Sequence, residues 1–502
     1  MALTQGELEN RLLAAANALR GPIDPADFKT YVFPMLFWKW LSDRWQWEHE
    51  IVVAEFGEEV EPEVEDDYHQ FAIPDGALWS QVTKTTKNLG VAINKAMGLI
   101  QQANPDRLAG IFGDAAWGNK ERLPEANLIN LINVLDGLSL SPEHVSNDLL
   151  GAAYEYLLRD FADASGQKAG EFFTPRSVVR LIVNILDPQP EESIYDPACG
   201  SGGMLVETIN TVRDHGGDVR TLHLYGQEVN LTTSGIARMN LLLHNIGVYE
   251  IKRGDTLRAP ALKAPNGHVQ QFDVVIANPP FSLKNWGHEL WAGDPRSFCG
   301  LPPKTSADMA WIQHMVTSMN PDGGRVGVVM PHGVLFRGGA EAKIRKCLIE
   351  DDRLEAVIGL PKNLFYSTSI PACILVFRSQ KPADRKGHVL FVDGSARFTK
   401  AKNRNEMQPD DVEAILAAYR TGEDPDGEGG AAVRLVSHDE IEGNGWDLNI
   451  GRYIKTAATD EVDLDTALAV YLEARENRIA AEQALFQRLT AAGIADLGDD
   501  DE

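Results

Sequence analysis

The chain has 502 residues, 44% of them hydrophobic and 24% charged, a globular composition that excludes a mainly disordered chain. At roughly 150 residues per domain, this length predicts about three domains. Aspartate and glutamate number 73 against 47 lysines and arginines, a formal charge of −26. Because affinity for a phosphate backbone comes from clustered cations, this balance excludes tight binding of nucleic acid unless a partner or a local patch supplies positive charge.

The first 142 residues are predicted to form a helical domain. Apolar residues recur at helical spacing over residues 8–19 and again over residues 127–138. Aromatic residues crowd residues 28–47. Because aromatic side chains mostly fill cores, we interpret this segment as a buried helix pair rather than a platform on which bases stack. The acidic run at residues 58–67 is predicted to be a solvated loop.

From residue 143 to residue 458, short apolar runs alternate with helical stretches and with Gly-rich or Asp-ended loops. Strands that alternate with helices predict an α/β domain with a doubly wound, mostly parallel sheet. The expected strands lie at residues 193–196, 222–226, 272–277, 325–330, 354–359 and 372–377, with a further short strand before Asp255.

Residues 459–502 are predicted to form a C-terminal helix, from Asp463 to about Leu489, and an acidic tail. The helix carries an apolar face with no obvious use in a finished catalytic domain. Two interpretations stay open: the helix packs on the core of its own chain, or it docks on a partner.

The four cysteines are widely scattered and form no C-x-x-C, so we expect neither a metal site nor a disulfide framework. The N-terminal residues lack the basic and apolar regions of a secretory signal. The longest apolar run, residues 31–38, is too short to span a bilayer. We therefore expect a cytoplasmic protein without a membrane partner.

A glycine-rich run, Asp196-Pro-Ala-Cys-Gly-Ser-Gly-Gly, follows the first expected strand and leads into a helix. Ligands of open α/β sheets bind beyond the carboxyl ends of the strands, and Gly200, Gly202 and Gly203 let the backbone approach one closely. The run has neither the dinucleotide pattern nor the lysine of a phosphate loop. A carboxylate with backbone groups suits an ammonium or a sulfonium, so the pattern indicates S-adenosylmethionine.

Two more acids follow the next two strands. Glu228 ends the second strand, where a carboxylate can bind a ribose diol. Asp255 follows the short third strand and could accept a hydrogen bond from an adenine amino group. Either acid alone is typical of an ordinary loop cap, but three acids in register with successive strand ends favour one cofactor site.

The expected strand at residues 272–277 is followed directly by Asn278, Pro279, Pro280 and Phe281. Two prolines fix φ and remove two donors, which leaves the Asn278 side-chain oxygen and the Pro279 carbonyl as stiff acceptors. An exocyclic amino group is a poor nucleophile because its lone pair is delocalised into the base. Two acceptors on its hydrogens would aim that lone pair at a methyl donor, and Phe281 could stack on a base flipped out of its duplex.

These runs resemble motifs I and IV of the amino-methyltransferases, in the order of the gamma class, and Gly170-Glu-Phe-Phe-Thr-Pro175 resembles their motif X. Residues 12–45, 365–371 and 446–453 are similar to HsdM, the modification subunit of type I restriction-modification systems. The resemblance covers nearly the whole chain. It implies a Rossmann-like, S-adenosylmethionine-dependent methyltransferase fold and an enzyme that methylates adenine N6 in double-stranded DNA.

The resemblance also implies site residues and partners. The target adenine would be held by residues 278–281, and the cofactor contacts would come from Glu171, Phe172, Phe173, Thr174, Pro175, Arg176, Ser201, Gly202, Gly203 and Glu228. The implied partners are a specificity subunit (HsdS-like), a second copy of the chain bound to the same specificity subunit, and a restriction subunit (HsdR-like). The C-terminal helix would then dock on the helical spacers of the specificity subunit.

Other acceptors and roles stay open. The same Asn-Pro-Pro-aromatic device serves enzymes that methylate RNA or a protein amide nitrogen, and a non-enzymatic assembly partner could retain the fold. The intact Asp196, Glu228, Asp255 and Asn278 argue against that last role. Methylation at cytosine C5 is disfavoured, because it needs a cysteine nucleophile and no Pro-Cys dipeptide occurs.

Overall fold

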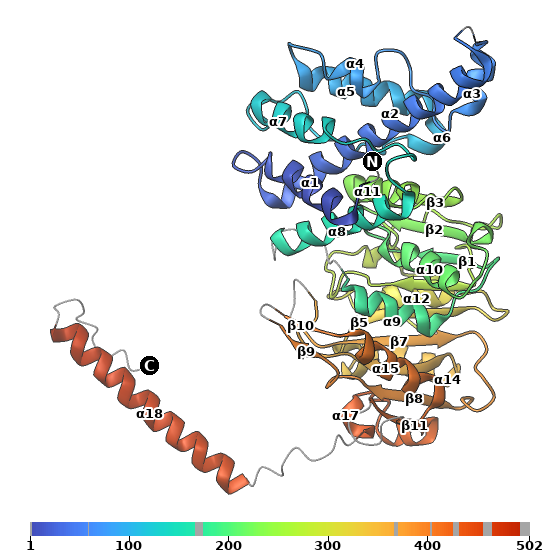
Figure 1. The fold of residues 1–502 in the computed structure, drawn as a ribbon. Coiled ribbons are helices and arrows are strands. Elements are labelled where there is room, and N and C mark those ends of the chain that lie inside the picture. Colours follow the sequence, from blue (N-terminus) through green and yellow to red (C-terminus); the bar gives the residue numbers. More distant parts are fainter. Residues whose placement is uncertain are drawn as a thin grey trace. The chain divides into compact units, whose positions relative to one another are not determined.

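The computed structural model describes residues 3–58, 60–165, 174–365, 370–401, 404–424, 431–454 and 464–491. Packing divides the chain into two units, Met1–Tyr453 and Ile454–Glu502, which are described separately. Figure 1 shows the helices and strands of both units. Among the described residues, none of the helices combines the length and the apolar character needed to cross a membrane.

The N-terminal region is helical, as the sequence predicts. Its helices are α1 (Gln5–Asn17), α2 (Phe28–Phe56), α3 (Pro62–Tyr68), α4 (Trp79–Val82), α5 (Leu89–Ala103), α6 (Pro105–Leu108), α7 (Glu125–Asp136) and α8 (Asn147–Ser165).

The aromatic segment is buried, but it forms the first part of one long helix, α2, rather than a helix pair. Trp38 and Phe33 are fully buried. The Trp38 indole donates to the Ala77 carbonyl at 2.9 Å, and the Phe33 ring lies 4.5 Å from that of Tyr154 on α8. These rings therefore build the core, and the interpretation against a base-stacking platform is confirmed.

The loop predicted for the acidic run is wrong over residues 62–67, which belong to α3. Pro62 occupies the first helical turn, where a missing N–H costs nothing. Glu63 and Glu65 lie in that turn as well, and negative charges there are favoured by the helix dipole. The acids therefore support a short helix instead of preventing one.

The predicted α/β fold is confirmed by a sheet of nine strands in the order β11-β8-β6-β7-β5-β4-β1-β2-β3. Neighbours from β5 to β3 run parallel, as do β6 and β8. Strand β7 is antiparallel to β5 and β6, and β11 is antiparallel to β8. The strands are β1 (Ser193–Asp196), β2 (His223–Glu228), β3 (Tyr249–Arg253), β4 (Val274–Ala277), β5 (Arg325–Pro331), β6 (Leu354–Gly359), β7 (Ala372–Arg378), β8 (His388–Asp393) and β11 (Ala432–Ser437).

Helices and a small hairpin complete the described residues. They are α9 (Arg176–Leu186), α10 (Gly203–Asp214), α11 (Leu231–Leu243), α12 (Asp308–Thr317), α13 (Gly333–Phe336), α14 (Ala340–Glu350), α15 (Pro409–Thr421), α16 (His438–Gly443), α17 (Ile450–Tyr453), the pair β9 (Thr399–Lys400) and β10 (Asn405–Glu406), and α18 (Leu464–Ala491) of the second unit.

Strand β1 lies between β2 and β4, so the direction in which the chain adds strands reverses there. Ligand crevices of open sheets form at such a reversal, beyond the carboxyl ends of the strands. Ile194 pairs with Val274, and Tyr195 pairs with Val275. This register brings the ends of β1 and β4, with Asp196 and Asn278, next to each other.

Helix α8 joins the N-terminal helices to the sheet. The Tyr154 hydroxyl donates to the carbonyl of Ile236 on α11 at 3.1 Å. A Cβ atom at Gly151 would lie 2.5 Å from a ring carbon of His244, which follows α11, so only glycine permits this approach. Ile236 and Met239 belong to the same hydrophobic core as the N-terminal helices.

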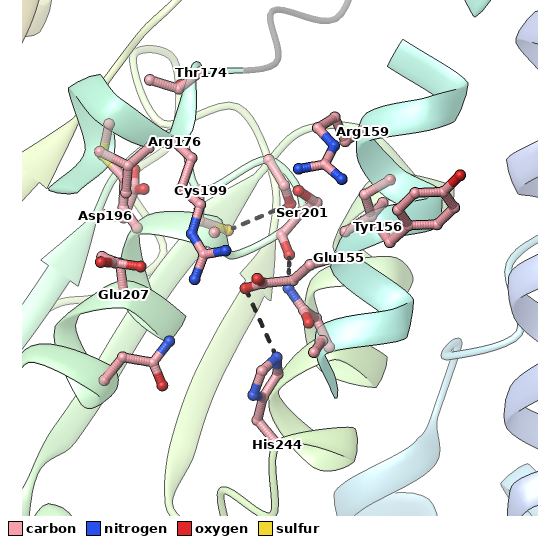
Figure 2. A pocket seen from close by; sticks show the side chains of 18 of the residues that line it. Glu155, Tyr156, Arg159, Thr174, Arg176, Asp196, Cys199, Ser201, Glu207 and His244 are labelled. Carbon is pink, nitrogen blue, oxygen red and sulfur yellow. Dashed lines mark hydrogen bonds and ion pairs between the residues drawn. The ribbon is translucent and has the colours of Figure 1, made fainter. Parts of the chain in front are cut away.

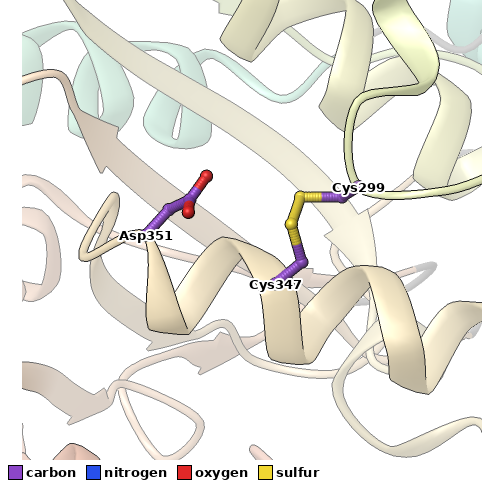
Figure 3. A group of neighbouring side chains, drawn as sticks. All are labelled: Cys299, Cys347 and Asp351. Carbon is purple, nitrogen blue, oxygen red and sulfur yellow. A yellow bond between two sulfur atoms is a disulfide. The ribbon is translucent and has the colours of Figure 1, made fainter.

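The structure joins Cys299 to Cys347 in a disulfide, with Cα atoms 5.6 Å apart (Figure 3). This corrects the expectation that the scattered cysteines form no such bond. The two residues are separated by 48 positions, so no local spacing reveals the pair, and only the packing of the loop before α12 against α14 brings them together.

Candidate active site

The glycine turn between β1 and α10 has the conformation that its residues predict. Gly200 and Gly202 have φ values of 52° and 80°, in the left-handed region that favours glycine. A Cβ atom at Gly200 would meet no atom of the described residues within 4 Å, whereas one at Gly202 would lie 3.5 Å from Ala237, so the turn borders open space at Gly200. The side chain of Asp196 is 2% exposed, and its Oδ1 accepts from the Ala198 N–H at 2.9 Å.

Glu228 closes this turn from the end of β2. One carboxylate oxygen accepts from the Gly200 N–H at 3.2 Å, and the other accepts from the Asn230 N–H at 2.8 Å. Asn230 caps the N-terminus of α11. The ligand contact of Glu228 stays a prediction, and the structure shows that this carboxylate links the glycine turn to the start of α11.

Asp255 lies two residues beyond β3, so the three predicted acids follow three adjacent parallel strands. Its Oδ1 accepts from the N–H groups of Leu257 and Arg258, each at 3.1 Å, and its Oδ2 lies 3.3 Å from the Arg258 Nε. Asp255 therefore caps its own turn, and it does not line the cavity described next.

A cavity of about 320 Å³ extends from the glycine turn to α8 (Figure 2). Seven residues predicted for the site line it, namely Thr174, Arg176, Asp196, Gly200, Ser201, Gly203 and Asn278. The predicted residues that do not line it are Pro175, Gly202, Glu228, Asp255 and residues 279–281. Glu171, Phe172 and Phe173 lie outside the described residues.

Much of the remaining lining of the cavity was not predicted. Glu155, Tyr156 and Arg159 come from α8, and Glu207, Asn210, Arg213 and His244 come from α10 and from the turn after α11. A carboxylate oxygen of Glu155 lies 3.7 Å from the His244 Nε2 (Figure 2). A local signal for this part of the lining does exist: Gly151 within the helical pattern of α8 marks the close approach to His244.

Burial shifts the pKa values of Asp196, Glu155, Glu207 and His244 toward their neutral forms. It raises the pKa of Asp196 to about 8, with help from the nearby Glu228 charge and against the Ala198 hydrogen bond. Burial also raises the pKa values of Glu155 and Glu207, and both increases are opposed by Arg176. It lowers the pKa of His244 to about 4. A positively charged ligand beside Asp196 would restore its charged form.

Asn278 lies at the carboxyl end of β4, beside Asp196. Its amide nitrogen donates to the Thr174 hydroxyl oxygen at 2.9 Å. Its amide oxygen is buried and has no hydrogen-bond partner among the described residues. An unsatisfied buried acceptor costs about 1–3 kcal/mol, so this oxygen is ready for a donor from a ligand.

The chain after the acceptor motif is held by residues that the sequence did not reveal. The Phe281 ring meets that of Phe365 edge-on at 5.9 Å. Ser282 has a φ of 51°, and its N–H donates to Asp308 at 2.6 Å. The Arg337 guanidinium donates to the second Asp308 oxygen at 2.9 Å. Asp308 is 1% exposed, so this contact fixes the end of the motif from inside the protein.

Comparisons with known proteins match nearly the whole chain. The family model described as N-6 DNA Methylase matches residues 145–462, and the model described as HsdM N-terminal domain matches residues 8–135. The MjaVII type I methylase subunit of Methanocaldococcus jannaschii is 34% identical, over 81% of this chain and 70% of its own length. The HindI methylase subunit of Haemophilus influenzae is 36% identical, over 64% of this chain and 72% of its own length. A solved type I methyltransferase subunit from Streptococcus thermophilus is 31% identical with a TM-score of 0.78, and the match covers 90% of this chain and 100% of that one.

Proposed function

Because the chain belongs to the N-6 DNA methylase family, with the type I restriction enzyme methylase subunits, we propose that it transfers a methyl group from S-adenosylmethionine to the N6 amino group of adenine in DNA. The observation that carries this proposal is the buried amide oxygen of Asn278, which has no hydrogen-bond partner in the described part of the chain. The methyltransferase fold expected from the sequence is confirmed by the Streptococcus thermophilus subunit.

The cavity suits S-adenosylmethionine through the chemistry of its walls. The glycine turn leaves open space at Gly200, and the buried Asp196 would gain from a neighbouring positive charge. We propose that the cofactor is contacted by the turn at residues 200–203, by Asp196 and by residues 174–176. Glu228 and Asp255 do not line the cavity but follow the next two strands. In this proposal the ribose extends beyond the cavity to Glu228, and the adenine ring's amino group donates to Asp255.

The cofactor supplies an electrophilic methyl group, and the chain supplies the geometry of attack. The Asn278 side-chain oxygen and the Pro279 carbonyl would accept the two hydrogens of the target amino group. Phe281 would stack on the flipped base. Preorganised acceptors act where charge develops, and they need no rearrangement at the moment of reaction. After transfer, the nitrogen releases one proton and keeps the other hydrogen.

The proposal includes a cytoplasmic complex with partners. A formal charge of −26 opposes tight binding of DNA by this chain alone. We therefore propose that it acts on double-stranded DNA together with a specificity subunit, a second copy of itself and a restriction subunit, as the family of type I methylase subunits implies.

A direct test incubates the chain, co-expressed with its specificity subunit, with methyl-labelled S-adenosylmethionine and double-stranded DNA. We expect the label in N6-methyladenine after digestion to nucleosides. Total RNA and a protein extract serve as parallel acceptors. Label in either of these, with none in DNA, would contradict the proposal and support one of the alternative acceptors. No transfer at all would point to a role in assembly only.

The affinity for S-adenosylmethionine is expected to rise with pH. Below the Asp196 pKa of about 8, the carboxyl is mostly protonated, and a bound cation must displace that proton. Affinity then increases by up to about tenfold per pH unit from pH 6 to pH 8 and levels off above. Calorimetry at several pH values measures this slope. Asp196→Asn is the control, because the ligand's own amino group titrates equally with both proteins. Equal slopes for both would exclude Asp196.

Glu228→Ala is expected to weaken S-adenosylmethionine binding about 10-fold to 100-fold. The change removes a charge-assisted hydrogen bond, worth roughly 1.5–3 kcal/mol, and frees the turn that Glu228 holds through the Gly200 N–H. Calorimetry gives the dissociation constant, and thermal unfolding separates a loosened turn from an unfolded protein. The matched control is Glu250→Ala on β3, which removes an acid paired with Lys252. An unchanged dissociation constant for Glu228→Ala would leave this residue with its structural contacts alone.

A further inference from the structure

Thr174 contacts both parts of the proposed site, the cofactor cavity and the acceptor motif that begins at Asn278. It immediately precedes Pro175 and helix α9, and it lines the cavity together with Asp196 and Arg176. Its hydroxyl also accepts the hydrogen bond from the Asn278 amide nitrogen, across 104 positions of sequence. A residue expected to contact the cofactor therefore also contacts the acceptor motif.

The side-chain amide of Asn278 has two donor hydrogens on one side and an acceptor oxygen on the other. Rotation of the amide by half a turn would present N–H groups to the target amino group, whose own hydrogens need acceptors. In the structure the nitrogen donates to Thr174, and the buried oxygen has no partner among the residues that the structure describes. Within the described part of the chain, this hydroxyl is the hydrogen-bond partner that holds the Asn278 side chain.

We propose that Thr174 is a positioning residue for methyl transfer. Its hydroxyl, which can accept from or donate to an amide, fixes the place of the Asn278 side chain, and the observed bond to the amide nitrogen leaves the oxygen for the acceptor nitrogen. The inference rests on the proposed function and deepens it, since it assigns the orientation of Asn278 to a residue of the cofactor side. Small losses of alignment at a reacting centre cost rate more than affinity. The role of Thr174 is thus distinct from a contact that only binds cofactor.

Thr174→Val and Thr174→Ser separate these roles. Valine keeps the shape of threonine without the hydroxyl, whereas serine keeps the hydroxyl. In the complex with the specificity subunit, we expect Thr174→Val to lower the single-turnover rate at saturating S-adenosylmethionine about 10-fold to 100-fold. Its dissociation constant for S-adenosylmethionine should stay within about threefold of the wild type, and Thr174→Ser should restore most of the rate.

Crystal structures of the two variants provide a readout that does not depend on activity. We expect the Asn278 amide to be displaced in Thr174→Val and to be in place in Thr174→Ser. An unmoved Asn278 in Thr174→Val, or a weaker cofactor affinity with a normal single-turnover rate, would overturn the inference and leave Thr174 as a cofactor contact. A wild-type complex that transfers no methyl to DNA would instead overturn the proposed function, while the crystal structures would still decide whether Thr174 holds Asn278.

Discussion

Asn278→Ala is expected to reduce methyl transfer by at least about a thousandfold while leaving S-adenosylmethionine binding nearly intact. Loss of a single preorganised hydrogen-bonding group at a reacting centre costs about a hundredfold to a thousandfold. Here the same change also leaves the amino lone pair conjugated with the base. The cofactor side of the cavity, at Asp196 and the glycine turn, loses no contact, because Asn278 bonds to Thr174 and not to that turn.

Single-turnover transfer of labelled methyl to DNA measures this loss, and calorimetry measures the cofactor affinity of the same preparation. Asn184→Ala is the matched control, since Asn184 lies half-buried on α9, does not line the cavity and donates to the carbonyl of Arg180 in the same helix. We expect the control to transfer methyl at the wild-type rate. Near-normal turnover of Asn278→Ala in the assembled complex would remove Asn278 from the proposed mechanism.

Deletion of residues 463–502 is expected to abolish assembly with the specificity subunit and site-specific methylation, without weakening cofactor binding. Helix α18 occupies most of this segment. Leu468, Leu472 and Ile479 are exposed, and at 100° per residue they lie within about 40° of one another around the helix. Every residue assigned to the cavity belongs to the other unit, Met1–Tyr453, so the deletion leaves the cofactor site complete.

Size-exclusion chromatography of the truncated chain with its specificity subunit tests assembly, and calorimetry tests cofactor binding. Leu472→Asp should reproduce the loss of assembly within the full-length chain. Arg488→Asp, at an exposed position on the opposite side of α18, introduces the same side chain and should assemble normally. A truncated chain that still assembles and methylates its site would assign the docking surface to other residues.

The sequence predicts most of the sheet because its central strands are continuous apolar runs. Val274–Ala277 is buried at every position, and such runs are recognisable without knowledge of their neighbours. Strands β8 and β11 were not predicted. The residues of β11 are mostly half-buried or exposed, so this strand lacks that signal. Strand β8 has four consecutive buried residues and therefore carries the signal, although it was not predicted. The full length of α2 was not predicted, because an internal proline, Pro34, is typical of a helix end. Helix α3 was not predicted, because its acidic residues are typical of a solvated loop.

The candidate site was predictable where its chemistry lies within a few consecutive residues. Asp196 and the glycines form one run, and Asn278 begins another. The residues that were missed meet this site from distant positions: Glu155 comes from α8, and Asp308 reaches Ser282 from α12. Local sequence carries no record of such tertiary contacts, and the same reason explains the unpredicted Cys299–Cys347 bond.

The shared core of α8 and α11 limits how this protein can be recombined with its relatives. Tyr154 bonds to the Ile236 carbonyl, and Gly151 leaves no room for any other residue beside His244. A chimera that takes its helical region from one relative and its sheet from another would therefore join two unmatched halves of one core. Such a hybrid has to take α8 and α11 from the same relative, although 82 positions separate Tyr154 from Ile236 in the chain. A functional chimera therefore has to exchange the two distant segments that contain α8 and α11 together, and a single crossover point between them is not sufficient.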